Sequence, residues 1–169
     1  FDVNVGGTKN LLDSVIKAKI NPKILVISSA EVYGTPKKVP INETHSLKPL
    51  SPYGESRLEQ EKICLEYFHK NNLNIIILRS FPHTGPGQRS DFVCSSFAKQ
   101  LAEIEVGKRK LLFVGNLDSR RDFIDVRDVV KAYALSLERC KIGEIYNVCS
   151  GKEISIKEIL DVLISFSNK

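Results

Sequence analysis

The sequence predicts an α/β protein built around a parallel sheet. Short apolar runs of the kind that form buried strands alternate along the chain with longer segments of helical periodicity. Strands separated by helices pair in parallel through right-handed crossovers, and a continuous apolar run suits a strand covered on both faces. We therefore expect one sheet flanked by helices, with ligands bound beyond the carboxyl ends of its strands.

The first half of the chain supplies two helices and one strand. Residues 2–19 carry a helix-like apolar stripe, and residues 23–28 (KILVIS) form a strand-like run. A polar loop with three prolines follows. Ser51 and Pro52 then have the residue types of a helix cap and first turn, which predicts a helix over 52–71.

The second half continues the alternation. The breaker-rich loop Pro82–Gln88 is expected to contain no regular structure. Around it the pattern predicts strands at 74–79, 111–114 and 144–148, and helices at 91–106, 126–139 and 155–166.

Composition narrows the function. The chain of 169 residues is 42% hydrophobic, and no apolar run is long enough for a membrane span. Its net charge of +5 is dispersed, which disfavours nucleic-acid binding. Four scattered cysteines without a C-x-x-C pair indicate neither a metal site nor a disulfide framework, and suit a cytoplasmic protein. The absence of an initiator Met and of a signal-like start suggests a piece of a longer chain.

Candidate catalytic residues gather at the end of the first strand and the start of the 52–71 helix. Tyr53 and Arg57 are four residues apart, so they share a helix face, and a cation beside a phenol favours the phenolate. Ser29 can hydrogen-bond the same reacting oxygen, and Glu31 adds a carboxylate able to move a proton. The pair Tyr33 and Lys37 has the same spacing, but Gly34 and Pro36 between them argue against a shared helix face.

Longer motifs turn this pattern into a family resemblance. The motifs are NVGGTKNLL (4–12), SSAEVYG (28–34), SPYGESR (51–57), HTGPGQ (83–88), FAKQ (97–100), AEIE (102–105), VGNL (114–117), RDF (121–123), DVRD (125–128) and YNVCSG (146–151). In these motifs the chain resembles the extended short-chain dehydrogenases/reductases, the NAD-dependent epimerase/dehydratase family. It is most similar to their branch of GDP-mannose 4,6-dehydratases and GDP-4-keto-6-deoxymannose reductases.

The resemblance implies a Rossmann-like sheet, an NAD or NADP cofactor and a nucleotide-sugar substrate, which in this branch is GDP-linked. Tyr53 would be the acid/base at the C4 oxygen of the sugar, beside Arg57, and Ser29 would hold that oxygen. Glu31 would remove the C5 proton in a dehydratase and would have a positional role in a reductase. The resemblance also implies cofactor contacts for Ser28, Tyr53, Arg57, Phe81 and His83, and substrate contacts for Pro82, Asn116 and Arg121.

Three departures from the family pattern qualify these roles. Arg57 stands where the family has a lysine, and the two cations differ in reach and geometry. Pro82 replaces a substrate-binding asparagine. The glycine-rich turn that cradles a dinucleotide pyrophosphate does not occur in these 169 residues. Gly6-Gly7 cannot take its place, because this pair lies in a helical pattern.

We therefore expect residues 1–80 to form the C-terminal half of a dinucleotide-binding domain. Residues 81–169 would mix a substrate-binding region with the remaining strands, and the glycine-rich half and the C-terminal end of the family's chain would be absent. Dehydratase and reductase both remain open, and the His83–Gln88 motif favours the reductase. The alternatives are a UDP-sugar epimerase or decarboxylase and a non-catalytic nucleotide-sugar-binding relative. The resemblance further implies a homodimer through helices 2–19 and 52–71.

Overall fold

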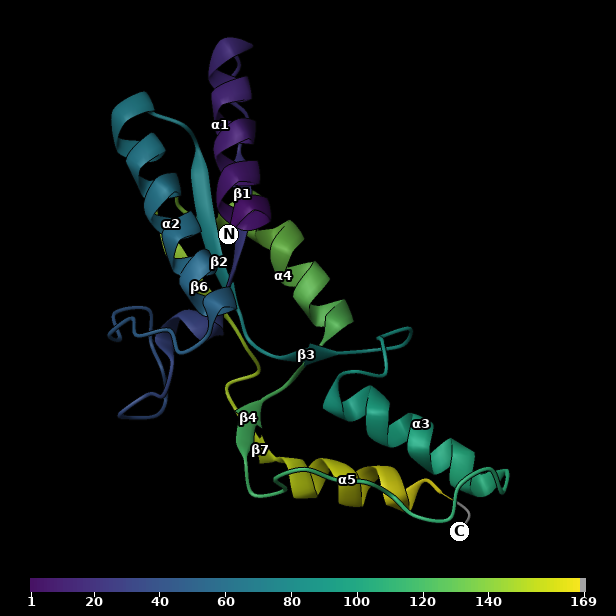
Figure 1. Cartoon of the computed structure of the whole chain (residues 1–169). Helices are drawn as coiled ribbons and strands as arrows, with labels where there is room; N and C mark the ends of the chain where they lie inside the picture. Colours follow the sequence, from purple (N-terminus) through teal and green to yellow (C-terminus); the bar gives the residue numbers. More distant parts are fainter. Residues whose placement is uncertain (168–169) are drawn as a thin grey trace. The chain divides into compact units, whose positions relative to one another are not determined.

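The computed structural model describes residues 1–167 (Figure 1). The chain forms two compact units. The sheet unit contains Phe1–Phe81 and Asp128–Val148, and the small unit contains Pro82–Arg127 and the chain from Cys149 onward. Each unit is therefore assembled from two separate stretches of sequence, because the chain leaves the sheet unit after Phe81 and re-enters it at Asp128.

A three-stranded parallel sheet is the centre of the sheet unit. Its strands are β1 (Ile24–Ser29), β2 (Ile75–Ser80) and β6 (Ile145–Val148), in the order β1-β2-β6. All six residues of the central strand β2 are buried, and the first four, Ile75–Leu78, form the apolar run seen in the sequence. The predicted α/β class with a parallel sheet is confirmed.

Helices cover both faces of this sheet. Helix α1 (Gly7–Lys17) follows a wide helical turn at Asp2–Gly6, and it lies side by side with α2 (Pro52–Asn71) (Figure 1). Successive strand residues point to opposite faces, and alternate residues of β2 belong to the core shared with α1 and α2. The opposite face meets α4 (Val126–Arg139), where the hydroxyls of Ser80 and Tyr133 are 2.7 Å apart. The core residues on the α1 and α2 face are Leu12, Val15, Val26, Cys64, Leu73, Ile75 and Ile77.

Helix α2 has well-defined ends. The Ser51 hydroxyl accepts the backbone N–H of Gly54 at 3.0 Å, and Pro52 occupies the first turn. After 20 residues the helix stops at Asn72, whose φ of 53° is left-handed. Its observed span agrees with the predicted 52–71, and its first turn lies against the carboxyl end of β1 (Figure 1).

The small unit has two short strand pairs and two helices. Strand β3 (His83–Thr84) pairs in parallel with β5 (Ile124–Asp125), and β4 (Arg120–Asp122) pairs antiparallel with β7 (Glu153–Ser155). Helices α3 (Val93–Glu105) and α5 (Ile156–Ser165) pack together around a core of Phe97, Ile156 and Leu160.

Two expectations for this unit are wrong. Residues 111–114 do not form a strand, because the backbone of Phe113 is held by the Gln100 side chain. Its N–H donates to Oε1 at 2.8 Å and its carbonyl accepts from Nε2 at 3.2 Å. The loop 82–88 contains the two-residue strand β3, which the concentration of glycine and proline concealed.

Residues 1–167 contain no helix that is both long and apolar enough to cross a bilayer. The four cysteines are not in disulfide bonds, and burial raises the pKa of Cys64 to about 12. Within the described part of the chain, histidine, cysteine and acidic side chains do not cluster as metal ligands would.

Candidate functional site

The candidate site begins at the carboxyl end of β1, where the chain enters a tight turn at Ala30–Tyr33. The Ser29 hydroxyl oxygen accepts the backbone N–H of Glu31 at 3.2 Å. Because this contact uses a lone pair, the hydroxyl hydrogen of Ser29 remains free to donate to another oxygen.

The start of α2 is attached directly to this turn. The Ser51 hydroxyl donates to Glu31 Oε2 at 3.1 Å. Gly54 packs so closely that a Cβ at its position would lie 2.8 Å from the backbone oxygen of Glu31. A side chain there would force the helix away from the turn, so glycine is required for the approach that brings Tyr53 next to the Ser29–Glu31 segment.

Tyr53 and Arg57 are in contact on the predicted helix face. Arg57 Nε donates to the Tyr53 hydroxyl at 3.1 Å, and its guanidinium carbon lies 5.1 Å from the centre of the ring. Tyr53 remains 47% exposed, so its phenol is accessible to a ligand. The predicted pairing is observed, whereas the catalytic role of the pair stays a prediction.

A glutamine that the sequence analysis did not single out holds the far side of this arginine. Arg57 NH1 donates to the backbone oxygen of Ile27 at 2.9 Å and to Gln60 Oε1 at 3.0 Å. Gln60 Nε2 donates in turn to the Thr8 hydroxyl at 2.7 Å. The contact between Arg57 and Gln60 could have been predicted from the sequence, because residues three apart lie on the same face of a helix.

Ser28 belongs to a buried ion-pair network beneath the site. Glu61 and Arg79 are both 2% exposed and form a two-point ion pair, Nε to Oε1 at 2.9 Å and NH2 to Oε2 at 2.7 Å. The Ser28 hydroxyl donates to the same Glu61 Oε1 at 2.5 Å. A cofactor contact from Ser28 stays a prediction, and it would have to come from the backbone, because this hydroxyl is committed to Glu61.

The network also accounts for Tyr33, the tyrosine of the second Tyr-x-x-x-Lys spacing. Its hydroxyl accepts Arg79 NH1 at 2.9 Å and donates to Asn147 Oδ1 at 2.7 Å. Burial raises the pKa of Tyr33, and the bond and charge of Arg79 oppose this only in part. Tyr33 lies in a short 3-10 turn that ends at Gly34, so it shares no helix face with Lys37.

The predicted residues that follow β2 are divided between the units. Phe81, in the sheet unit, is buried and donates its N–H to the Val148 oxygen at 2.9 Å. Pro82 and His83 belong to the small unit. The Pro82 oxygen accepts the Ile124 N–H at 3.1 Å, and the His83 oxygen accepts Gln88 Nε2 at 3.1 Å.

The last two predicted substrate residues lie on exposed segments of the small unit. Asn116 Oδ1 accepts the backbone N–H of Asp118 at 2.9 Å, which fixes a local turn. Arg121 is exposed, and its NH1 donates to the backbone oxygen of Arg120 at 2.7 Å. Within residues 1–167, Arg121 forms no ion pair with an acidic side chain, so its guanidinium can bind an anion.

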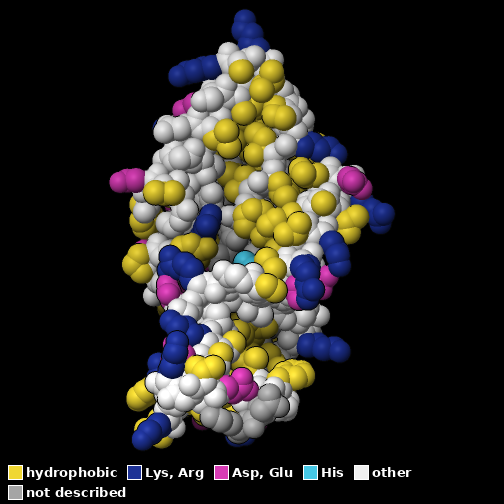
Figure 2. All heavy atoms as spheres, turned by 90° about the vertical axis from the view of Figure 1, so that its right-hand side faces the viewer, with side chains coloured by type: hydrophobic (Ala, Val, Ile, Leu, Met, Phe, Trp, Pro, Cys, Tyr) yellow, Lys and Arg dark blue, Asp and Glu magenta, His cyan; other side chains and the backbone are white. Residues whose placement is uncertain are grey.

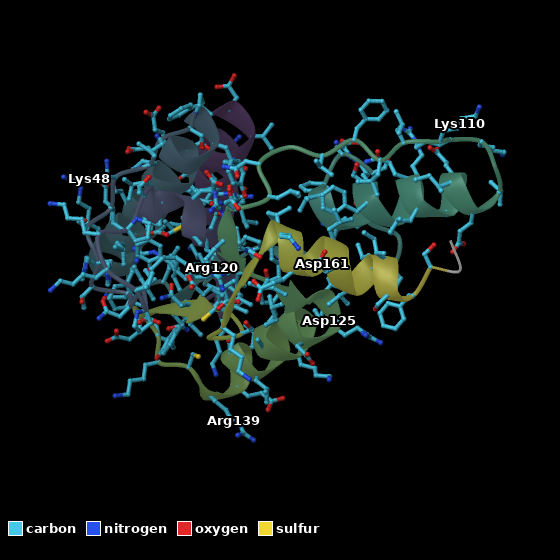
Figure 3. The ribbon with its side chains drawn as sticks, turned by 90° about the horizontal axis from the view of Figure 1, so that it is seen from below. Lys48, Lys110, Arg120, Asp125, Arg139 and Asp161 are labelled. Atoms are coloured by element: carbon cyan, nitrogen blue, oxygen red, sulfur yellow. The ribbon has the colours of Figure 1, made fainter. Side chains whose placement is uncertain are left out.

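The neighbouring Arg120 differs from Arg121 in this respect. Its Nε lies 2.8 Å from Glu153 and its NH1 lies 3.2 Å from Glu158, so it belongs to an ion-pair cluster beside α5 (Figure 3). Two adjacent arginines therefore have different environments.

The fold and the motifs together indicate a short-chain dehydrogenase/reductase of the extended type. The model of the family described as GDP-mannose 4,6 dehydratase matches residues 1–167, and the chain belongs to this family.

Two curated relatives illustrate the range of the family. The chain is 38% identical over 166 residues to a GDP-6-deoxy-D-mannose reductase of Pseudomonas aeruginosa, covering 96% of this chain and 55% of the relative. It is 30% identical over 162 residues to human GDP-mannose 4,6 dehydratase, covering 95% of this chain and 43% of the relative. The chain thus spans about half the length of these relatives.

Solved structures agree with these relationships. The structure of RMD from Pseudomonas aeruginosa complexed with NADPH matches with a TM-score of 0.94 and 38% identity, over 97% of this chain and 57% of that one. UDP-glucuronic acid 4-epimerase from Bacillus cereus, in complex with UDP-glucuronic acid and NAD, matches with a TM-score of 0.87 and 31% identity. That match covers 100% of this chain and 53% of the other.

Proposed function

We propose that the protein containing this chain reduces a keto group at C4 of a GDP-linked 6-deoxyhexose, with NAD(P)H as the hydride donor. The observation that carries the proposal is the contact between Arg57 Nε and the exposed Tyr53 hydroxyl, on a helix whose first turn is fastened to the Ser29–Glu31 turn. The 38% identity to a GDP-6-deoxy-D-mannose reductase supports this choice of substrate.

The residues present fit a nicotinamide site on their chemistry. Tyr53 offers an exposed phenol, and the guanidinium of Arg57 has its NH2 group free of hydrogen bonds to residues 1–167, where a ribose hydroxyl can accept it. A nicotinamide cofactor, when bound, supplies the hydride that adds to C4.

The chain's own residues manage the proton. The Tyr53 hydroxyl donates its proton to the C4 oxygen as negative charge develops there, and the C4 hydroxyl forms. Ser29 donates its free hydrogen to the same oxygen and stabilises the developing charge. The guanidinium of Arg57 stabilises the phenolate left on Tyr53 until a solvent proton replaces the one transferred.

Glu31 separates the reductase from the dehydratase. The Ser51 hydroxyl donates to Oε2 of Glu31, which ties this carboxylate to the start of α2. We assign Glu31 the positional role expected in a reductase. The HTGPGQ motif at 83–88 favours the same assignment.

Arg121 is the residue that we expect to bind the substrate diphosphate. A guanidinium presents two parallel N–H donors that suit phosphate oxygens, and this one is exposed and unpaired by acidic side chains of residues 1–167. Asn116 is assigned to the same substrate. Pro82 contributes only its ring and carbonyl, so the interaction of the family's asparagine is lost at this position.

The test is a reaction assay on the full-length protein with GDP-4-keto-6-deoxymannose and either NADPH or NADH. We expect consumption of the reduced cofactor together with formation of the GDP-6-deoxyhexose. Tyr53→Phe should lower kcat by about a hundredfold or more, because one positioned acid is lost. Folding should not change, since Tyr53 is half exposed and, within residues 1–167, its hydroxyl is bonded to the side chain of Arg57.

Other outcomes would favour the alternatives. Conversion of GDP-mannose to the 4-keto sugar without net consumption of cofactor would indicate a dehydratase, and interconversion of UDP-sugars would indicate an epimerase. Nucleotide-sugar binding without turnover would indicate the non-catalytic relative that Arg57 and Pro82 make worth testing.

We also propose that the protein forms a homodimer through α1 and α2, in the cytoplasm. Support comes from the apolar side chains that α1 leaves exposed, Leu11 at 56% and Ile16 at 37%, and from the hydrophobic surface in the upper part of Figure 2. A strict monomer at micromolar concentration in sedimentation analysis would exclude it. If the dimer forms, Leu11→Arg should dissociate it without unfolding the sheet unit.

A further inference from the structure

Arg57 is held by more contacts than a helix-surface arginine needs. Its Nε faces the Tyr53 hydroxyl, while NH1 donates to the Ile27 oxygen and to Gln60. Tyr53 lies in the first turn of α2, Ile27 in strand β1, and Gln60 one turn beyond Arg57 in α2. A guanidinium is planar with donors in fixed directions, so fixing NH1 also fixes the direction of Nε.

Gln60 is placed to control this orientation. Its side chain is only 7% exposed and lies between Arg57 and α1. The amide oxygen accepts Arg57 NH1 at 3.0 Å, and the amide nitrogen donates to the Thr8 hydroxyl at 2.7 Å. Turning the amide over would set its NH2 group against NH1 of Arg57, which can only donate, so the amide oxygen must face Arg57 while Thr8 anchors the other end of Gln60.

We propose that Gln60 is a positioning residue, which orients Arg57 toward the Tyr53 hydroxyl and makes this site specific for arginine rather than lysine. Gln60 does not touch the reacting atoms. It acts through Arg57, and the proposal rests on the proposed role of Tyr53 as the acid.

The geometry explains why lysine does not simply replace Arg57. The arginine uses two separate nitrogens, one for Tyr53 and one for the pair formed by Ile27 and Gln60. Lysine has a single ammonium nitrogen on a flexible stem, so all three acceptors would compete for one atom. In the present surroundings, an ammonium drawn toward Ile27 and Gln60 would leave the phenol without its fixed cation.

The main experiment uses the full-length protein with Gln60→Ala, Gln60→Glu, Arg57→Lys and the double variant Gln60→Ala/Arg57→Lys. Gln60→Ala should lower kcat about tenfold, which is less than the loss expected when the acid itself is removed. KM for the sugar nucleotide should change by less than about twofold. Gln60→Glu keeps an acceptor for Arg57 and one for the Thr8 hydroxyl, so it should remain within about threefold of the wild type.

Coupling between the two residues is the sharper result. Arg57→Lys should lower kcat by about tenfold, and adding Gln60→Ala should cost less than about a further twofold, because the partner that Gln60 orients is already gone. Glu59→Gln is the matched control. It changes the adjacent residue of the same helix, which within residues 1–167 forms a surface ion pair with Lys62 alone, and it should leave kcat unchanged.

A second readout does not require turnover. The Nε–H proton of Arg57 can be observed by NMR in the ligand-free protein, and its exchange with water should accelerate at least about fivefold in Gln60→Ala but not in Gln60→Glu or Glu59→Gln. Circular dichroism verifies that each variant is folded.

These results separate the two proposals. An inactive wild type with the expected exchange pattern would remove the proposed function and leave the orienting role of Gln60 intact. An unchanged exchange rate and kcat in Gln60→Ala would overturn the role of Gln60, as would independent, multiplicative effects of the two substitutions or an Arg57→Lys variant at least as fast as the wild type.

Discussion

Arg57 in the sheet unit and Arg121 in the small unit are both candidate site residues, and they are held in different ways. Arg57 donates to Tyr53, Ile27 and Gln60, whereas Arg121 donates to the carbonyl of its neighbour Arg120. The difference extends to their surroundings. Beneath the site in the sheet unit lies a buried network, while Asn116 and Arg121 of the small unit lie on exposed segments. Under the proposed function, the rigidly held Arg57 would keep the proton donor in place, and the less constrained Arg121 would adapt to the substrate.

The largest expected effect comes from breaking the buried ion pair. Arg79→Met leaves Glu61 buried without its cation and should lower the free energy of unfolding by about 3–5 kcal/mol. Arg120→Met, in the exposed cluster with Glu153 and Glu158, should cost several times less, because solvent already screens those charges. Denaturant titration of both variants measures the contrast, and equal losses would contradict the distinction between the units.

A close backbone approach should produce the next largest effect. Gly54→Ala places a Cβ 2.8 Å from the Glu31 oxygen and 3.0 Å from Pro49 Cβ, so the start of α2 must shift. We expect a loss of about 1–3 kcal/mol in stability, with a decrease in kcat because Tyr53 moves with the helix.

Gly115 in the small unit is the matched control. A Cβ there meets no atom within 4 Å, and Gly115→Ala should change stability by less than about 0.5 kcal/mol. Thermal melts and activity assays compare the two variants. If Gly54→Ala is tolerated as well as Gly115→Ala, the close approach at Gly54 does not matter for the fold or the site.

Arg121 should affect binding rather than the chemical step. Arg121→Ala removes the proposed diphosphate contact and should raise KM for the sugar nucleotide about tenfold, the size of one charge-assisted hydrogen bond, with kcat within about threefold of the wild type. Arg120→Ala is the control, since that guanidinium is already paired. Steady-state kinetics measure both values, and a larger rise in KM for Arg120→Ala would reverse the assignment.

The smallest effect concerns pH and the start of α5. The backbone N–H of Ser155 donates to the Glu158 carboxylate at 2.8 Å and, together with the Ser155 side chain and Arg120, lowers the pKa of Glu158. A lowered folded-state pKa contributes stability that is present above the ordinary carboxyl pKa and is lost as the pH falls through the lowered value.

Glu158→Ala should therefore be slightly less stable than the wild type at neutral pH, and the difference should shrink as the pH falls through that range. Thermal melts over a pH series measure it. A difference that stays constant with pH would show that the helix cap acts without the charge.

Local patterns predicted much of the sheet unit. Ser51-Pro52 and the following sequence predicted α2 with the observed bounds, and the apolar runs located β1, β2 and β6 within one residue. The contact between Tyr53 and Arg57 was predictable because both lie on one helix, where a spacing of four residues fixes proximity. The short strands β4, β5 and β7 were missed, since two or three residues carry no periodicity.

The sequence by itself determined the elements that depend on neighbours a few residues away: the caps and length of α2, the buried strands, and the tyrosine and arginine on one helix face. Only the tertiary structure decided which long-range partners these residues acquire. It joined Ser28 to Glu61, Glu61 to Arg79, Glu31 to Ser51 and Gln60 to Thr8, pairs that are between 18 and 52 residues apart. The physical reason is that buried polar groups must find partners wherever packing places them, and a single sequence carries no periodic signal for a contact between distant elements.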